Sequence, residues 1–142
     1  MTNCKVDTVH GSQSGDHADI MQCWAMSANR TFIVDRMDGI TQYQGFMLQP
    51  QQFGVDDGVV FDIRNSILRK SSTDNGGYLI YESNASGYEV KCSNVQFQQG
   101  ASKTTALYYP LSARPAGIRV VTSANDEPVL IGSPGVGYVR PS

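Results

Sequence analysis

Apolar and polar residues alternate along much of this chain in short stretches, which is the pattern of half-buried β-strands. Four of these stretches share one order: alternation, then an Asn or Asp, then renewed alternation. They cover residues 2–11, 31–43, 59–71 and 88–100, and the markers are Asn3, Asp38, Asn65 and Asn94. The intervals between the markers are 35, 27 and 29 residues, so the pattern predicts a structural repeat.

Each marker is followed by a polar connection and a second apolar stretch, which covers residues 17–24, 43–50, 77–83 and 105–111. A fifth, partial unit contains residues 118–121 and 128–131. Repeats of this length without a helical period are typical of β-solenoid coils, which bury one continuous apolar interior when stacked. The sequence therefore predicts an all-β, parallel β-helix of about five coils, as a single domain over residues 1–142. A β-sandwich or jelly roll also has short strands between turns and is the alternative fold.

The recurring Asn or Asp has a physical role in a coiled chain. A corner between two strands requires a bent or left-handed backbone, which Asn and Asp tolerate better than most L-residues. Amides at equivalent corners can also hydrogen-bond from one coil to the next. The markers are therefore predicted to lie at the same corner of successive coils.

Charge and composition narrow the classes of partner. Lys and Arg number 11 and Asp and Glu 13, and this net charge of -2 gives no electrostatic basis for binding nucleic acid or an anionic membrane. No apolar run is long enough to span a bilayer, and the N-terminal residues lack the features of a signal peptide. Charged residues make up only 17% of the chain, and the polar, uncharged remainder suits an extracellular or virion protein.

Three cysteines bear on metal and disulfide chemistry. Cys4, Cys23 and Cys92 are odd in number, and no two have the C-x-x-C spacing. The sequence therefore predicts neither a zinc site nor a disulfide framework, but buried thiols that act as small apolar side chains. No metal and no other cofactor is predicted.

Residues 15–22, with the sequence GDHADIMQ, resemble the H-x-D-x-x-Q strand of right-handed parallel β-helix proteins in the pectate-lyase-like superfamily. Residues 43–50 and 62–68 resemble the next two coils, and the likeness covers most of residues 2–110. The superfamily contains polysaccharide lyases, hydrolases, epimerases and phage tailspikes. The resemblance therefore implies a right-handed β-helix whose partner is a polysaccharide or other glycan.

Members of this superfamily have more coils than the present chain, and a cap covers the first coil. The resemblance therefore implies that only C-terminal coils are present, in a chain truncated at its N-terminal end or part of a larger assembly. A bare solenoid end exposes unpaired backbone and invites aggregation. We therefore expect a homo-oligomer, such as the trimer of tailspikes, or a second chain that covers this end.

His17 and Asp19 are the candidate catalytic pair. Residues two apart on a strand share a face. With Ala18 and Ile20 pointing inward, the pair is expected to point outward together with Met21. An imidazole beside a carboxylate can act as a general acid or base on a sugar ring. The alternative is a surface hydrogen bond that orders a coil corner without catalysis.

An exposed groove is expected beside the catalytic pair. Tyr43 of the next coil can stack on a sugar or supply a proton, and Arg36 comes from a neighbouring strand. Both are candidate carbohydrate-binding residues.

Further candidate carbohydrate-binding residues are aromatic, because aromatic rings cover the apolar faces of sugars. Tyr81 and Tyr109 fall in equivalent strands, each near a second tyrosine, Tyr78 or Tyr108. Outward rings would form a platform for sugars, and inward rings would belong to the core. Trp24 follows the strand of His17 and can belong to either set.

Charged residues elsewhere have simpler interpretations. Asp56-Asp57-Gly58 is typical of a turn. Arg69-Lys70 is expected to be an exposed, solvated pair of charges.

Two functions fit these observations. The first is a polysaccharide-binding β-helix module with a structural or adhesion role, such as part of a phage tailspike or another virion protein. The second is a polysaccharide lyase or hydrolase that acts on an acidic glycan through His17 and Asp19. The sequence lacks a complete catalytic motif, which favours the first.

Overall fold

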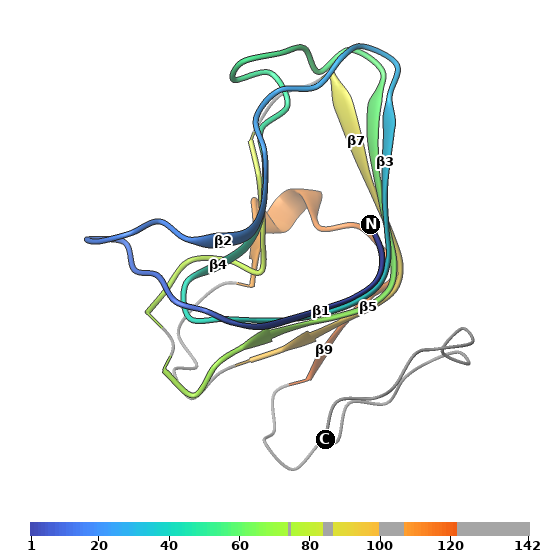
Figure 1. Cartoon of the computed structure of the whole chain (residues 1–142). Helices are drawn as coiled ribbons and strands as arrows, with labels where there is room; N and C mark the ends of the chain where they lie inside the picture. The colour runs from blue at the N-terminus through green and yellow to red at the C-terminus, as the bar shows by residue number, and fades with distance from the viewer. Residues whose placement is uncertain (74, 84–86, 100–106, 122–142) are drawn as a thin grey trace.

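The computed structural model describes residues 1–73, 75–83, 87–99 and 107–121, and its strands form two sheets (Figure 1). The long sheet contains, in spatial order, β1 (Thr2–Val9), β3 (Thr31–Thr41), β5 (Val59–Lys70), β7 (Tyr88–Gln98) and β9 (Ile118–Val121). The short sheet contains β2 (Asp19–Cys23), β4 (Gln44–Leu48), β6 (Ile80–Glu82) and β8 (Tyr108–Tyr109). A 3-10 helix, η1 (Leu111–Ala113), follows β8. No helix in the described ranges is long and apolar enough to cross a membrane.

Consecutive strands alternate between the two sheets, so the chain winds as a solenoid. All seven strand pairings in the described chain are parallel, which excludes the antiparallel β-sandwich. The predicted fold class is therefore confirmed as an all-β, parallel β-solenoid, with about three turns. This is fewer than the five coils predicted, and β9 is the only strand of the predicted fifth unit that lies within the described residues. The predicted strand at residues 128–131 lies outside the described residues.

The core lies between the two sheets and is built from columns of inward-facing residues. Leu68 at the centre of the long sheet pairs with Gly39 on one side and with Phe97 on the other. Leu68 and Phe97 are 0% exposed. Fully buried side chains of the short sheet are Phe46, Leu48 and Ile80. Each buried side chain of this size stabilises the fold by about 1.5–3 kcal/mol relative to an exposed position.

The strands of the long sheet bend where the backbone adopts left-handed dihedral angles (Figure 1). The residues at the bend are in register, and we call them the bend ladder: Asn3 (φ 54°), Arg36 (57°), Asn65 (51°), Asn94 (55°) and Gly117 (88°). The amide of Asn94 donates to Asn65 Oδ1 over 2.8 Å, and the amide of Asn65 donates to Asp35 Oδ1 over 2.9 Å. The predicted corner role is therefore confirmed for three of the four markers.

The fourth marker, Asp38, was assigned wrongly. Arg36 occupies the bend two residues earlier, where its Nε donates to Asn3 Oδ1 and its guanidinium group pairs with Asp35 at 3.2 Å. Asp38 lies beyond the bend, is 2% exposed and forms an ion pair with Arg69. With Arg36 as the marker, the first three intervals become 33, 29 and 29 residues.

The predicted burial of the thiols is confirmed for Cys23, whereas Cys4 and Cys92 are only partly buried. Cys4, Cys23 and Cys92 are free and pack with the apolar core. Burial raises the pKa of Cys23 to about 11. Burial, with the nearby Glu82 and Asp62 carboxylates, raises the pKa of Cys92 to about 12. These two thiols are therefore protonated at neutral pH and poor nucleophiles.

Candidate functional site

Three connections from the long sheet to the short sheet meet at one corner of the solenoid. They are residues 10–18 after β1, residues 42–43 after β3 and residues 71–79 after β5. Backbone hydrogen bonds hold this region together: Gln42 N donates over 2.9 Å to the oxygen of Val9, the last residue of β1, and Asn75 N donates to Gln42 O over 2.7 Å. We call this region the connecting corner.

The connecting corner brings together three of the residues selected from the sequence. The exposed His17 packs its ring edge-on against Tyr43, with 5.0 Å between the ring centroids. Asp19 begins β2 and accepts a hydrogen bond from the Gln22 amide at Oδ2. Its Oδ1 is buried and has no hydrogen-bond partner among the described residues. Lost hydration raises the pKa of Asp19, while the Gln22 hydrogen bond and the charge of His17 oppose this rise. The catalytic roles of His17 and Asp19 remain predictions.

The expected orientation of this strand was wrong. Met21 was expected to point outward, but it is 8% exposed and belongs to the core, as does Cys23. Asp19 shares their face, and the exposed Gln22 lies on the opposite one. Tyr43 is 7% exposed, so little of its ring is open to a ligand. Burial and the negative charge of Asp19 raise the pKa of Tyr43.

Arg36 and Trp24 lie apart from the connecting corner. Arg36 stands in the bend ladder and its guanidinium group faces Asp35 and Asn3. Trp24 follows β2 and is 36% exposed. Its ring lies 6.0 Å from the ring of Phe53, which is 71% exposed. The structure therefore brings His17, Asp19 and Tyr43 together and places Arg36 apart from them.

Two tyrosines on the short sheet and one on the connection before β6 are in mutual contact, and we call them the tyrosine cluster. Tyr81 and Tyr109 are in register on β6 and β8, and their rings stack with 5.2 Å between centroids and 5° between planes. Tyr78 lies 6.0 Å from Tyr81 and 5.1 Å from Tyr109. All three rings are half-buried. Tyr108 points the other way, is 1% exposed and donates to the Glu82 carboxylate.

The tyrosine cluster continues toward the connecting corner. Gly77 precedes Tyr78 and has a φ of +70°, and a Cβ atom on it would lie 3.0 Å from Cδ2 of Tyr43. Tyr43 in turn contacts His17. His17, Tyr43 and Tyr78 thus come from three successive connections, and Tyr81 and Tyr109 come from β6 and β8.

Arg69 and Lys70 do not form the expected exposed pair. Lys70 is 5% exposed, and its Nζ donates to the backbone oxygens of Tyr43 and Gly76. Arg69 turns to the other face and pairs with the buried Asp38. Lys70 therefore fixes the connecting corner from inside, because it holds two connections through one ammonium group.

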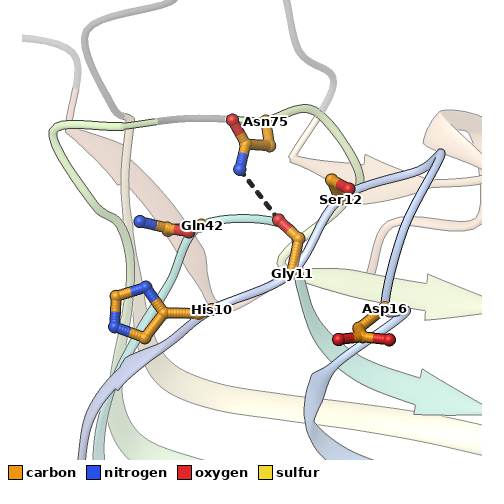
Figure 2. Close-up of a pocket in the computed structure, with 6 residues that line it drawn as sticks. All are labelled: His10, Gly11, Ser12, Asp16, Gln42 and Asn75. Atoms are coloured by element: carbon orange, nitrogen blue, oxygen red, sulfur yellow. Dashed lines mark hydrogen bonds between the residues drawn. The ribbon is translucent and has the colours of Figure 1, made fainter.

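A polar hollow of about 260 Å³ opens at the connecting corner (Figure 2). Its lining residues are His10, Gly11, Ser12, Asp16, Gln42 and Asn75. The Asn75 side chain donates to Gly11 O over 2.9 Å and so ties two of the connections together. Sequence reasoning did not select this set. The strand register could have indicated part of it, because the end of β1 pairs with the end of β3 and so places His10 beside Gln42.

The described residues contain no group of three or more His, Cys, Asp or Glu side chains that could hold a metal ion. Comparison of the chain with protein-family models, with curated proteins and with solved structures gave no match in any of the three.

Proposed function

We propose that this protein is a polysaccharide-binding β-solenoid module with a structural or adhesion role, of the pectate-lyase-like kind found in phage tailspikes. The observation that supports the proposal is the tyrosine cluster, in which two rings on the short sheet and the ring of Tyr78 on the preceding connection are partly exposed and in mutual contact. Rings in this arrangement offer flat apolar surface to the C–H faces of sugars and hydroxyl groups to their oxygens.

The solenoid suits a long ligand because its surface repeats along the axis. Parallel strands lie about 4.8 Å apart, so Tyr81 and Tyr109 present equivalent groups at the spacing of one strand. A ring held between strands also loses little conformational freedom when a sugar binds. An extended glycan could thus contact several turns without any rearrangement of the backbone.

The same proposal includes an extracellular or virion location and a homo-oligomer, with a trimer or a second chain covering one end. Its support is the position of β1 and β2, each the first strand of its sheet and paired on one side only within the described chain. Their free edges can accept another strand. Molar mass by light scattering tests this part, and a monodisperse monomer would contradict it.

The binding proposal is tested with a panel of immobilised neutral and acidic polysaccharides. We expect at least one to bind, and expect Tyr81→Ala and Tyr109→Ala each to weaken that binding about tenfold, since about 1.4 kcal/mol corresponds to a factor of ten. Tyr81→Phe is the matched control, because it keeps the ring and removes only the hydroxyl group. Unchanged binding in both alanine variants would refute the role of the cluster.

An enzyme acting on an acidic glycan is the second candidate, and one observation favours it. Asp19 is half-buried with a raised pKa beside the exposed His17, an arrangement from which a carboxyl group can exchange a proton with a sugar. The test is the release of reducing ends or unsaturated products from polyuronates. Activity that is lost in both His17→Ala and Asp19→Asn would support this candidate, and no product after prolonged incubation would exclude these substrates.

A further inference from the structure

The polar hollow is built from groups that recognise hydroxyls. His10, Ser12 and Gln42 each offer both a donor and an acceptor, and Asp16 adds an acceptor that forms charge-assisted bonds. Neighbouring hydroxyls on a sugar ring are matched to such a lining, because each hydroxyl both donates and accepts. No apolar side chain lines the hollow, so a lipid or an aromatic ligand finds no complementary surface there.

Charge restricts the ligand further. None of the six lining residues, all of them in the described chain, is Lys or Arg, and Asp16 is their only full charge at neutral pH when histidine is counted as neutral. A uronate or sulfated sugar would bring a second negative charge toward Asp16 without meeting a cation. This repulsion opposes the binding of an acidic sugar.

A side-chain hydrogen bond between two of the connections holds the hollow in shape. Asn75 holds the connection after β5 against the connection after β1 through its 2.9 Å bond to Gly11 O. Figure 2 shows this bond above Gly11, with His10 and Gln42 on one side and Ser12 and Asp16 on the other. The three connections that form the hollow also carry His17, Tyr43 and Tyr78, so the hollow and these rings share the connecting corner.

We propose that the hollow is a subsite for one neutral sugar unit, which it binds through hydroxyl groups and which sets the preference of the protein for neutral over acidic glycans. This inference rests on the proposed glycan-binding function. In it, the tyrosine cluster supplies stacking that tolerates many sugars, and Asp16 with Gln42 supplies the discrimination.

The test is isothermal titration of the full chain with soluble oligosaccharides of equal length, made from glucan, mannan, galactan and polygalacturonate. We expect one neutral series to bind at least about tenfold more tightly than the uronate series. Asp16→Asn and Gln42→Ala should each weaken that binding about tenfold, as the loss of one good hydrogen bond does. The matched controls are Asp57→Asn and Gln52→Ala, exposed on another connection, which should change the affinity less than about twofold.

The outcomes separate this inference from the function on which it rests. If Tyr81→Ala abolishes binding while Asp16→Asn and Gln42→Ala bind as the unchanged chain does, the subsite is refuted and the binding function stands. A uronate series that binds as tightly as the neutral ones also refutes it. If no series binds, both proposals fail together. Thermal unfolding of each variant checks that the connecting corner remains folded.

Discussion

The bend ladder allows a direct measurement of how much a left-handed corner contributes to stability. Asn65 has a φ of 51°, donates to Asp35 over 2.9 Å and accepts from Asn94 over 2.8 Å. Because Asn65 is exposed, each bond is worth about 0.5 kcal/mol, at the low end for hydrogen bonds. Asn65→Gly keeps the backbone conformation accessible and loses both bonds, so we expect a loss of about 1 kcal/mol. Asn65→Ala loses the same bonds and also holds a Cβ atom in the left-handed region, which adds about 1 kcal/mol.

The assay is urea unfolding followed by far-ultraviolet circular dichroism, with thermal unfolding in parallel. A protein of this size changes Tm by about 3 °C per kcal/mol, so Tm should fall by about 3 °C in Asn65→Gly and by about 6 °C in Asn65→Ala. Ser72→Ala, at an exposed position, should change stability by no more than about 0.5 kcal/mol. If the two variants at position 65 are equally stable, the left-handed backbone has no cost and the reasoning about corners is refuted. If the glycine variant matches the unchanged chain, the amide bonds contribute nothing.

Three other perturbations follow from buried groups. Cys23 and Cys92, with pKa values raised to about 11 and 12, should react with iodoacetamide at pH 8 far more slowly in the native protein than in urea, and equal rates would contradict their burial. Arg69→Met should destabilise the protein by about 3 kcal/mol in urea unfolding, because it leaves the Asp38 carboxylate buried without its partner, and adding Asp38→Asn should restore most of the loss. The raised pKa of Asp19 means that its charged form opposes folding, so stability contributed by its protonation is lost as pH rises above the ordinary value of 3.8. Asp19→Asn should therefore raise Tm at pH 7 and leave it unchanged near pH 3, and a lower Tm at pH 7 would reverse this assignment.

The parts of the fold that were predictable depend on local chemistry. β9 was located because three of its four residues are β-branched and favour strands, and Asn3, Asn65 and Asn94 were located because Asn tolerates the left-handed conformation. Arg36 was not predicted at the bend because Arg has no preference for the left-handed conformation. Nothing about an isolated Arg favours a positive φ, and its place at the bend follows from the register with its neighbours on both sides.

The candidate site depended more on long-range packing and was harder to predict. β2 has apolar residues on both faces, so Ile20 and Met21 do not show which face points inward. The exposed Gln22 was the one local indication that Met21 lies on the inner face. Two adjacent basic residues are usually solvated, and Lys70 is buried because the fold brings the carbonyl groups of Tyr43 and Gly76 to it. No pattern within a single repeat contains that information.

The connecting corner tolerates unequal spans of chain. Two of the three connections have nine residues, at 10–18 and 71–79, and the third has two, at 42–43, yet the strands on either side stay in register. Insertions in these connections therefore need not disturb the strands, since the main-chain hydrogen bonds between strands resume directly after each connection. Stacking constrains the residues of the interior. We therefore expect substitutions and insertions in the loops of this corner to be tolerated without a change of fold.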